Sequence, residues 1–117
     1  MGDIVVHLVS AMICFGGHCY PTLVGPATPR GDFNVVHLQT SLPGYSGDVL
    51  AFAQDDRGVF AIHRVWTLAP AQRRLERLRL GGPSARRGVT EGCINVMPEV
   101  YAALVDCCST GHVQVTD

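Results

Sequence analysis

The chain contains no lysine, so its 9 basic residues are all arginines. Aromatic residues make up only 7% of its 117 residues, and the formal net charge is -1. A general nucleic-acid binder carries a clear excess of positive charge, which this chain lacks. Disordered chains are poor in apolar residues, whereas 47% of this one is hydrophobic. The composition therefore predicts a folded protein that does not bind nucleic acid, and the length fits a single domain over residues 1–117.

Long apolar runs are also missing, because no segment is long enough to span a bilayer. The N-terminal apolar stretch follows Asp3, is interrupted by His7, and has no positively charged segment in front of it. These features do not match a signal peptide. If the protein is exported, we expect that it uses another route or that a leader has been removed.

Glycine pairs and strand-like runs give the order of the elements. Gly16 and Gly17 supply the positive φ angles of a two-residue turn, which predicts a hairpin in MICFGGHCYP. In this register Cys14 faces Cys19 at a separation near disulfide range, which allows a bridge. Further strands are expected within residues 32–38, 47–53, 58–65 and 112–116.

Two helices are predicted late in the chain. One covers residues 69–82, where Pro70 suits a first turn and a glycine pair ends the pattern. The other starts at Pro98 and runs through EVYAALVD. Several short strands, with two short helices that flank Cys93, predict a mainly β domain with a small α component.

The segment GVTEGCINV holds Cys93, and a strand-like run upstream of it carries His63. A cysteine attacks as the thiolate, and an imidazole that takes its proton makes the attack feasible near neutral pH. Gly92 lets the backbone approach a substrate carbonyl, and a nearby N–H can stabilise the oxyanion. The alternative from the residues alone is a buried structural cysteine and a strand histidine with a structural hydrogen bond.

A zinc site is an alternative for the other cysteines, because CFGGHC, Cys107, Cys108 and His112 together contain enough ligands. Adjacent cysteines fit poorly on one tetrahedral ion, and the chain has no paired C-x-x-C motif. We therefore predict no metal site.

The basic residues are concentrated between His63 and Cys93, where Glu76 is the only acidic residue before Glu91. Such a locally positive segment favours an anionic ligand, although a solvated helix face has the same composition. Arg64 and Trp66, which follow the histidine closely, are candidates for substrate binding. We also expect Arg86 and Arg87 to bind substrate, and at least one of Arg73, Arg74, Arg77, Arg86 and Arg87 to contact it.

Two parts of the chain carry a resemblance to a known family. AIHRVW, a basic helix and then GVTEGCINVMPEVYAALV resemble the catalytic domain of the L,D-transpeptidases. The motif of that family is a histidine followed by Ser or Thr, any residue, Gly, Cys, an aliphatic residue, and Arg or Asn. The earlier stretch YPTLVGPATPRGDFNV is similar to the family's segment of a glycine, a Thr-Pro pair, a glycine and a strand. The resemblance covers nearly the whole chain, with the parts in the same order.

The resemblance implies a β-sandwich-like catalytic fold, no cofactor, and peptidoglycan stem peptides as substrate. It makes Cys93 the nucleophile and His63 its base, with Thr90, Gly92 and Asn95 as the frame of the motif, and Asn95 is also expected to contact substrate. A thioester would form at the L,D bond as the terminal D-amino acid leaves. An amine would then resolve it to give crosslinks or D-amino-acid exchange, or water would give L,D-carboxypeptidase activity.

The chain departs from the family pattern at Glu91, where histidine is common, and at Gly88, where arginine is common. The charge of Glu91 is expected to raise the pKa of the thiol. The alternative function is therefore a non-catalytic domain that binds the cell wall or a partner and retains the fold. The substrate class implies the periplasm or cell wall, for a housekeeping enzyme or for a secreted effector with a secretion or immunity partner.

Overall fold

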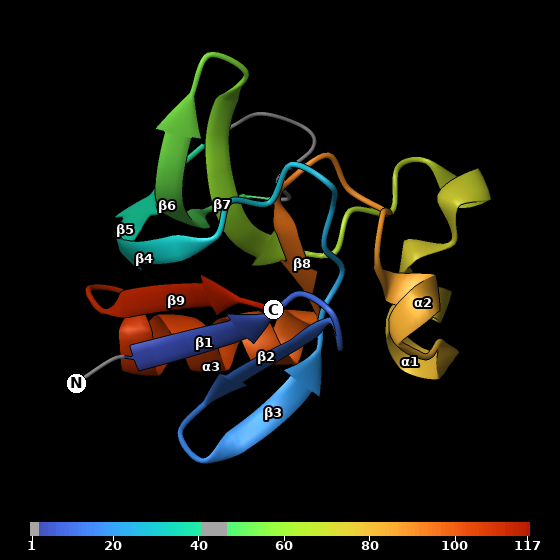
Figure 1. The fold of residues 1–117 in the computed structure, drawn as a ribbon, viewed down its shortest axis with the longest axis horizontal. Coiled ribbons are helices and arrows are strands. Elements are labelled where there is room, and N and C mark those ends of the chain that lie inside the picture. Colours follow the sequence, from blue (N-terminus) through green and yellow to red (C-terminus); the bar gives the residue numbers. More distant parts are fainter. Residues whose placement is uncertain (1–2, 41–46) are drawn as a thin grey trace.

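The computed structural model describes residues 3–40 and 47–117 and arranges their strands in two sheets (Figure 1). Within these residues, the first sheet has 5 strands in the order β3-β2-β1-β9-β4. β1 pairs with β2 antiparallel and with β9 in parallel, so β9 lies between β1 and β4. The strands are β1 (Asp3–His7), β2 (Met12–Phe15), β3 (His18–Pro21), β4 (Gly31–Asn34) and β9 (His112–Thr116).

The second sheet has the strand order β5-β6-β7-β8. β7 and β8 run parallel, and His63 lies opposite Asn95 in their register. The strand expected within residues 32–38 is divided at the buried Val35, because its first half pairs in one sheet and its second half in the other. The strands are β5 (Val36–Leu38), β6 (Val49–Asp55), β7 (Gly58–Arg64) and β8 (Ile94–Val96).

The predicted hairpin between β2 and β3 is confirmed. Gly16 and Gly17 have φ angles of 59° and 82°, which a type I′ turn needs and which glycine adopts readily. Cys14 lies opposite Cys19 in the predicted register, and their sulfurs form a disulfide.

The basic segment after β7 forms three short helical pieces, not the single helix predicted over residues 69–82. A 3-10 turn, η2 (Pro70–Gln72), begins at the predicted proline, and Arg73 then adopts a left-handed φ of 51°. This conformation interrupts the helical path, so α1 (Arg74–Leu80) starts only at the next residue. α2 (Pro83–Arg86) follows, and the two helices lie together at one side of the molecule (Figure 1).

α3 (Pro98–Cys108) begins at the predicted proline. Its buried side chains are the adjacent Val100 and Tyr101, then Leu104 and Cys108 at spacings of three and four residues, as expected for a helix with one face on the core. Cys107 and Cys108 form a second disulfide, so all the cysteines of the zinc alternative are disulfide-bonded. None of the helices in the described part of the chain has the length and hydrophobicity to cross a membrane.

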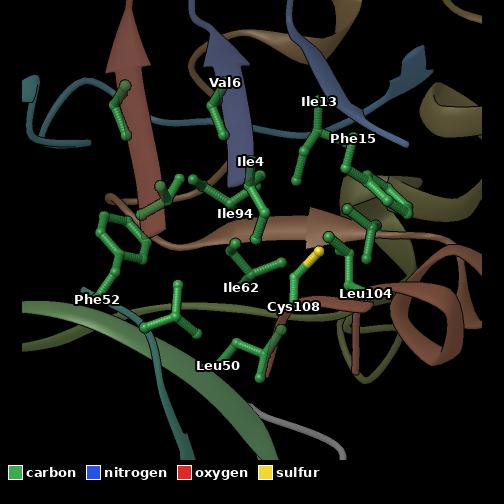
Figure 2. Packing of buried hydrophobic residues seen from close by; sticks show 14 of the residues in the cluster. Ile4, Val6, Ile13, Phe15, Leu50, Phe52, Ile62, Ile94, Leu104 and Cys108 are labelled. Carbon is green, nitrogen blue, oxygen red and sulfur yellow. The ribbon is translucent and has the colours of Figure 1, made fainter. Parts of the chain in front are cut away.

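The main hydrophobic core brings together side chains from both sheets and from α3 (Figure 2). Burial of a Leu, Ile or Val side chain contributes about 1.5–3 kcal/mol. Ile62 on β7 and Ile94 on β8 are both fully buried in it, so the core fixes the two strands that hold His63 and lead from Cys93. Its labelled members in Figure 2 are Ile4, Val6, Ile13, Phe15, Leu50, Phe52, Ile62, Ile94, Leu104 and Cys108. The architecture is thus mainly β with short helices, as the sequence predicted.

Candidate active site

Cys93 lies directly before β8 and is the only free cysteine of the described residues. Its side chain is half-buried, and its thiol donates a long hydrogen bond of 3.8 Å to the carbonyl oxygen of Val59 on β7. Successive side chains of a strand alternate between faces, so Cys93 and Asn95 point to the same side. His63 is opposite Asn95, which places the histidine and the cysteine on one face of adjacent strands.

A pocket of about 220 Å³ opens on this face. Both His63 and Cys93, the residues predicted to be a base and its nucleophile, line this pocket. The turn before β8 and the β6–β7 hairpin contribute most of the remaining wall. The other lining residues include Phe60, Arg74, Thr90, Glu91 and Gly92.

The tautomer of His63 follows from its hydrogen bonds. Nδ1 lies 2.7 Å from the carbonyl oxygen of Arg64, and a carbonyl only accepts, so Nδ1 carries the proton. Nε2 is therefore the basic nitrogen, and it accepts a long hydrogen bond of 3.4 Å from the amide of Asn95. Burial lowers the pKa of His63 to about 4, and the charges of Arg74 and Arg64 also lower it. The imidazole is thus neutral at pH 7 and able to take a proton.

The thiol is the other half of this pair. Burial raises the pKa of Cys93, and the nearby charge of Glu91 raises it further. A backbone hydrogen bond with Ala61 and the charge of Arg74 act in the opposite direction. Because the thiol is a weaker acid than usual and His63 a weaker base, the resting site holds a neutral thiol beside a neutral imidazole. The effect expected of Glu91 on the thiol pKa is confirmed in direction.

Residues 24–28 hold the turn that carries Cys93. The N–H of Ala27 donates to the carbonyl oxygen of Glu91 over 2.8 Å, and the hydroxyl of Thr28 donates to that of Gly92 over 2.8 Å. Gly25 is packed so closely here that a Cβ on it would lie 2.0 Å from the carbonyl oxygen of Thr90. The segment VGPATPRG therefore holds the backbone of the turn that carries Cys93 in place.

Two further residues of the motif have structural reasons to be present. The hydroxyl of Thr90 donates to the carbonyl oxygen of Cys93 over 2.6 Å, which braces the turn from inside. A Cβ on Gly92 would lie 2.3 Å from the ring of the buried Phe60, so only glycine fits without displacing that ring. Thr90 and Gly92 thus shape the backbone around Cys93.

Arg74 was only one of several candidates in the basic segment, but it is the one that reaches this pocket. It is 9% exposed, and its Nη1 donates to Oδ1 of Asn95 over 3.0 Å. Its Nε donates to Oε1 of Gln72 over 2.7 Å, and the guanidinium lies 4.9 Å from the centre of the Trp66 ring. The left-handed conformation of Arg73, which makes α1 start at Arg74, has no clear signal in the sequence.

The structure does not bring the other predicted substrate-binding residues to the pocket lining. Arg86 is buried, and its guanidinium donates to the carbonyl oxygens of Ser10, Ala11 and Gly81. Arg87 donates to the carbonyl oxygen of Val9 over 2.7 Å. These side chains tie the segment before Cys93 to the first sheet, and backbone carbonyls take the donors that a substrate would need.

Arg64 and Trp66 also lie outside the pocket lining. Arg64 forms an ion pair with Asp48 at 2.8 Å and covers the ring of Tyr101 at 4.3 Å. The backbone N–H of Trp66 donates to Oδ1 of Asn95 over 3.3 Å. Asn95 is therefore held by Trp66 and Arg74 and contacts His63, so its side chain helps to orient the imidazole.

The chain was compared with known proteins. No family model matches it, and no curated protein sequence does. Solved structures do match: L,D-transpeptidase 3 from Mycobacterium tuberculosis, in complex with a faropenem-derived adduct, gives a TM-score of 0.66 at 14% identity. That match covers 98% of this chain and 60% of the other. An L,D-transpeptidase from Mycobacterium smegmatis gives a TM-score of 0.58 at 20% identity, over 98% of this chain and 58% of that one.

A third similar structure is an L,D-transpeptidase from Stackebrandtia nassauensis, with a TM-score of 0.59 at 15% identity. It is matched over 97% of this chain and 54% of its own length. The chain thus spans between 54% and 60% of the length of these three structures. All three carry the same family name, and each is matched along nearly the whole of this chain. The chain therefore has the fold of the L,D-transpeptidase catalytic domain.

Proposed function

We propose that this protein is a cysteine-dependent acyl transferase that acts on peptidoglycan stem peptides. It would cleave the L,D bond in front of a terminal D-amino acid. The observation that carries the proposal is the position of Cys93 and His63 on one face of β7 and β8, lining one pocket. The fold shared with L,D-transpeptidases supports the substrate class. Because that substrate is in the cell wall, we place the site of action in the periplasm or cell wall.

The first step forms a thioester. His63 takes the thiol proton on Nε2 as Sγ of Cys93 attacks the carbonyl carbon of the L-centre, and the resulting oxyanion accepts from the backbone N–H of Cys93. The C–N bond then breaks, and the proton on Nε2 passes to the leaving amine of the D-amino acid. The contact between Nε2 and Asn95 is long, so little is lost when Nε2 turns to the thiol.

The second step breaks the thioester. An incoming amine, or water, loses its proton to His63 as it attacks the same carbonyl carbon. The C–S bond breaks, and Cys93 regains its proton. An amine from a second stem peptide gives a crosslink, a free D-amino acid gives exchange, and water gives a shortened peptide.

Mass spectrometry of stem tetrapeptides incubated with the protein tests this proposal. We expect loss of the terminal D-amino acid, exchange for an added D-amino acid, or a crosslinked product, together with a peptide adduct on Cys93. Cys93→Ala should give no product and no adduct, and its fold should be retained because the change removes little volume.

The same experiment separates the enzyme from a binding domain. If the wild-type protein gives neither product nor adduct while its Cys93 is alkylated normally, the enzymatic proposal is wrong. Co-sedimentation with purified cell-wall sacculi then tests the non-catalytic alternative.

A further inference from the structure

Arg74 carries a buried positive charge that no carboxylate neutralises within residues 3–40 and 47–117. It is 9% exposed, and it forms no ion pair with the described acidic residues. Its hydrogen-bond acceptors are the neutral amide oxygens of Asn95 and Gln72. Buried charges in proteins are usually paired, because an unpaired one loses its hydration without compensation.

The guanidinium of Arg74 also has hydrogen-bond donors that no described residue accepts. Nε and Nη1 donate to the two amides, whereas no hydrogen bond from Nη2 is present in the described part of the chain. Among the described residues, Nε1 of Trp66 is the one fully buried side-chain nitrogen or oxygen that has no hydrogen-bond partner. Nη2 of Arg74 also has no partner there but is not fully buried, so it retains access to solvent. A planar guanidinium with a free edge is well suited to bind a carboxylate.

The other charges of the pocket do not offer the same site. Arg57 lines the pocket as well, but its Nη2 forms an ion pair with Oδ2 of Asp55 at 2.6 Å. Glu91 lies at the wall and repels anions, and His63 is neutral at pH 7. Arg74 is therefore the cation of this pocket that has no counter-charge among the described residues.

We propose that Arg74 forms an anion-binding subsite beside Cys93, and that its ligand is a carboxylate of the molecule that Cys93 attacks. The ligand would supply the missing counter-charge, while Asn95, Gln72 and Trp66 hold the guanidinium in place before it binds. The presence of an anion site does not depend on the proposed function. Its assignment to a stem-peptide carboxylate rests on that function.

Two thiol reagents test the anion site without any substrate. Iodoacetate and iodoacetamide both transfer a substituted methylene carbon to the sulfur of Cys93 with loss of iodide, and they differ in carrying a carboxylate or an amide. A change in the thiol pKa alters both rates equally and cancels in their ratio. We expect Arg74→Gln to lower the ratio of iodoacetate to iodoacetamide rate by about tenfold, as loss of one charged hydrogen bond predicts.

Two variants control this measurement. Arg79→Gln, on the exposed side of the same helix, should leave the ratio unchanged, and Arg74→Lys should restore part of it. If Arg74→Gln slows both reagents equally or leaves the ratio at the wild-type value, Arg74 supports the thiol or the fold and the anion site is absent. Because Arg74→Gln can also disturb the fold, the ratio is measured for the wild-type protein at rising salt, where an anion site requires it to fall.

Amidated tetrapeptides identify the carboxylate. One peptide has its C-terminal D-residue amidated and the other has the carboxylate of its diamino acid amidated. The peptide whose turnover no longer responds to Arg74→Gln lacks the carboxylate that Arg74 binds. If both still respond, neither carboxylate is the ligand and this assignment is wrong. If the wild-type protein turns over neither the amidated peptides nor the free peptide, the proposed function is wrong. The ratio of the two alkylation rates still shows whether Arg74 forms an anion site.

Discussion

The Nδ1–H of His63 donates to the carbonyl oxygen of its own neighbour Arg64 over 2.7 Å. The acceptor that fixes the tautomer of His63 is thus a neutral backbone group on the same strand. A carboxylate in this position would stabilise the imidazolium through its charge, whereas the hydrogen bond to the neutral carbonyl raises the pKa of His63 by less than burial lowers it. The contact with Arg64 thus orients the imidazole, and burial makes it weakly basic.

The lowered pKa of His63 makes stability depend on pH. The unfolded chain binds a proton at this residue below about pH 6.5, whereas the folded chain binds it only below a pKa of about 4. Stability is therefore complete above pH 6.5 and falls as the pH drops toward 4, by up to about 3 kcal/mol. The glutamine of His63→Gln binds no proton, so this variant should lack the part of the stability loss that comes from protonation of His63.

Urea unfolding followed by circular dichroism at several values between pH 7 and pH 4 measures both proteins. The carboxylates are common to both and cancel in the difference. Equal pH dependence in the two proteins would show that His63 is protonated in the folded state at its ordinary pKa.

Glu91 should slow the reaction of Cys93 with neutral reagents. Its charge raises the pKa of the thiol, so Glu91→Gln should lower that pKa and increase the thiolate fraction at neutral pH. We expect the iodoacetamide rate at pH 7 to rise about threefold. The pH profile of the rate is the measurement, and a profile that does not move would mean that solvent screens Glu91 from the sulfur.

Arg86 should matter for stability and Arg87 much less. Arg86→Gln removes hydrogen bonds to three backbone carbonyls from a buried side chain, and we expect a loss of about 3 kcal/mol in the free energy of unfolding. Arg87→Gln removes one exposed contact and should cost less than about 1 kcal/mol. Chemical denaturation compares the two variants directly, and similar losses would contradict the structural assignment of Arg86.

Gly25 should tolerate no side chain. An alanine Cβ there would lie 2.0 Å from the carbonyl oxygen of Thr90, so the reactive turn must shift, at a cost of about 1–3 kcal/mol and with slower alkylation of Cys93. Gly82 has open space around it and a negative φ, so Gly82→Ala is the matched control with stability near wild type. Thermal unfolding and the iodoacetamide rate of the two variants test this, and a neutral Gly25→Ala would mean that residues 24–28 yield easily.

The sequence predicted features that depend on local chemistry. The hairpin at Gly16 and Gly17 follows from φ angles that glycine adopts readily, and α3 starts where Pro98 fits a first turn. Cys93 and His63 were predicted to be a nucleophile and its base because residues of these types form a recognisable motif. The structure places both in the lining of one pocket.

Features that depend on distant contacts were not predicted. β8 is only three residues long, so its period gives almost no signal, and it exists because β7 pairs with it. The roles of Arg74 and Arg86 differ because one faces Asn95 and the other faces backbone carbonyls of the first sheet. Both lie in one arginine-rich run, and its composition does not distinguish them.

The position of β9 sets the order in which this chain can fold. Asp3 pairs with His112 in the first sheet, and β4 joins that sheet only through β9. The second sheet needs only residues 36–96, whereas the first cannot close before residues 112–116 have been synthesised. Contacts between residues so distant in sequence require a long loop of chain to close. The chain loses conformational entropy when this loop closes, which slows folding. During synthesis we therefore expect the second sheet to form early and to keep its apolar face exposed until β9 docks.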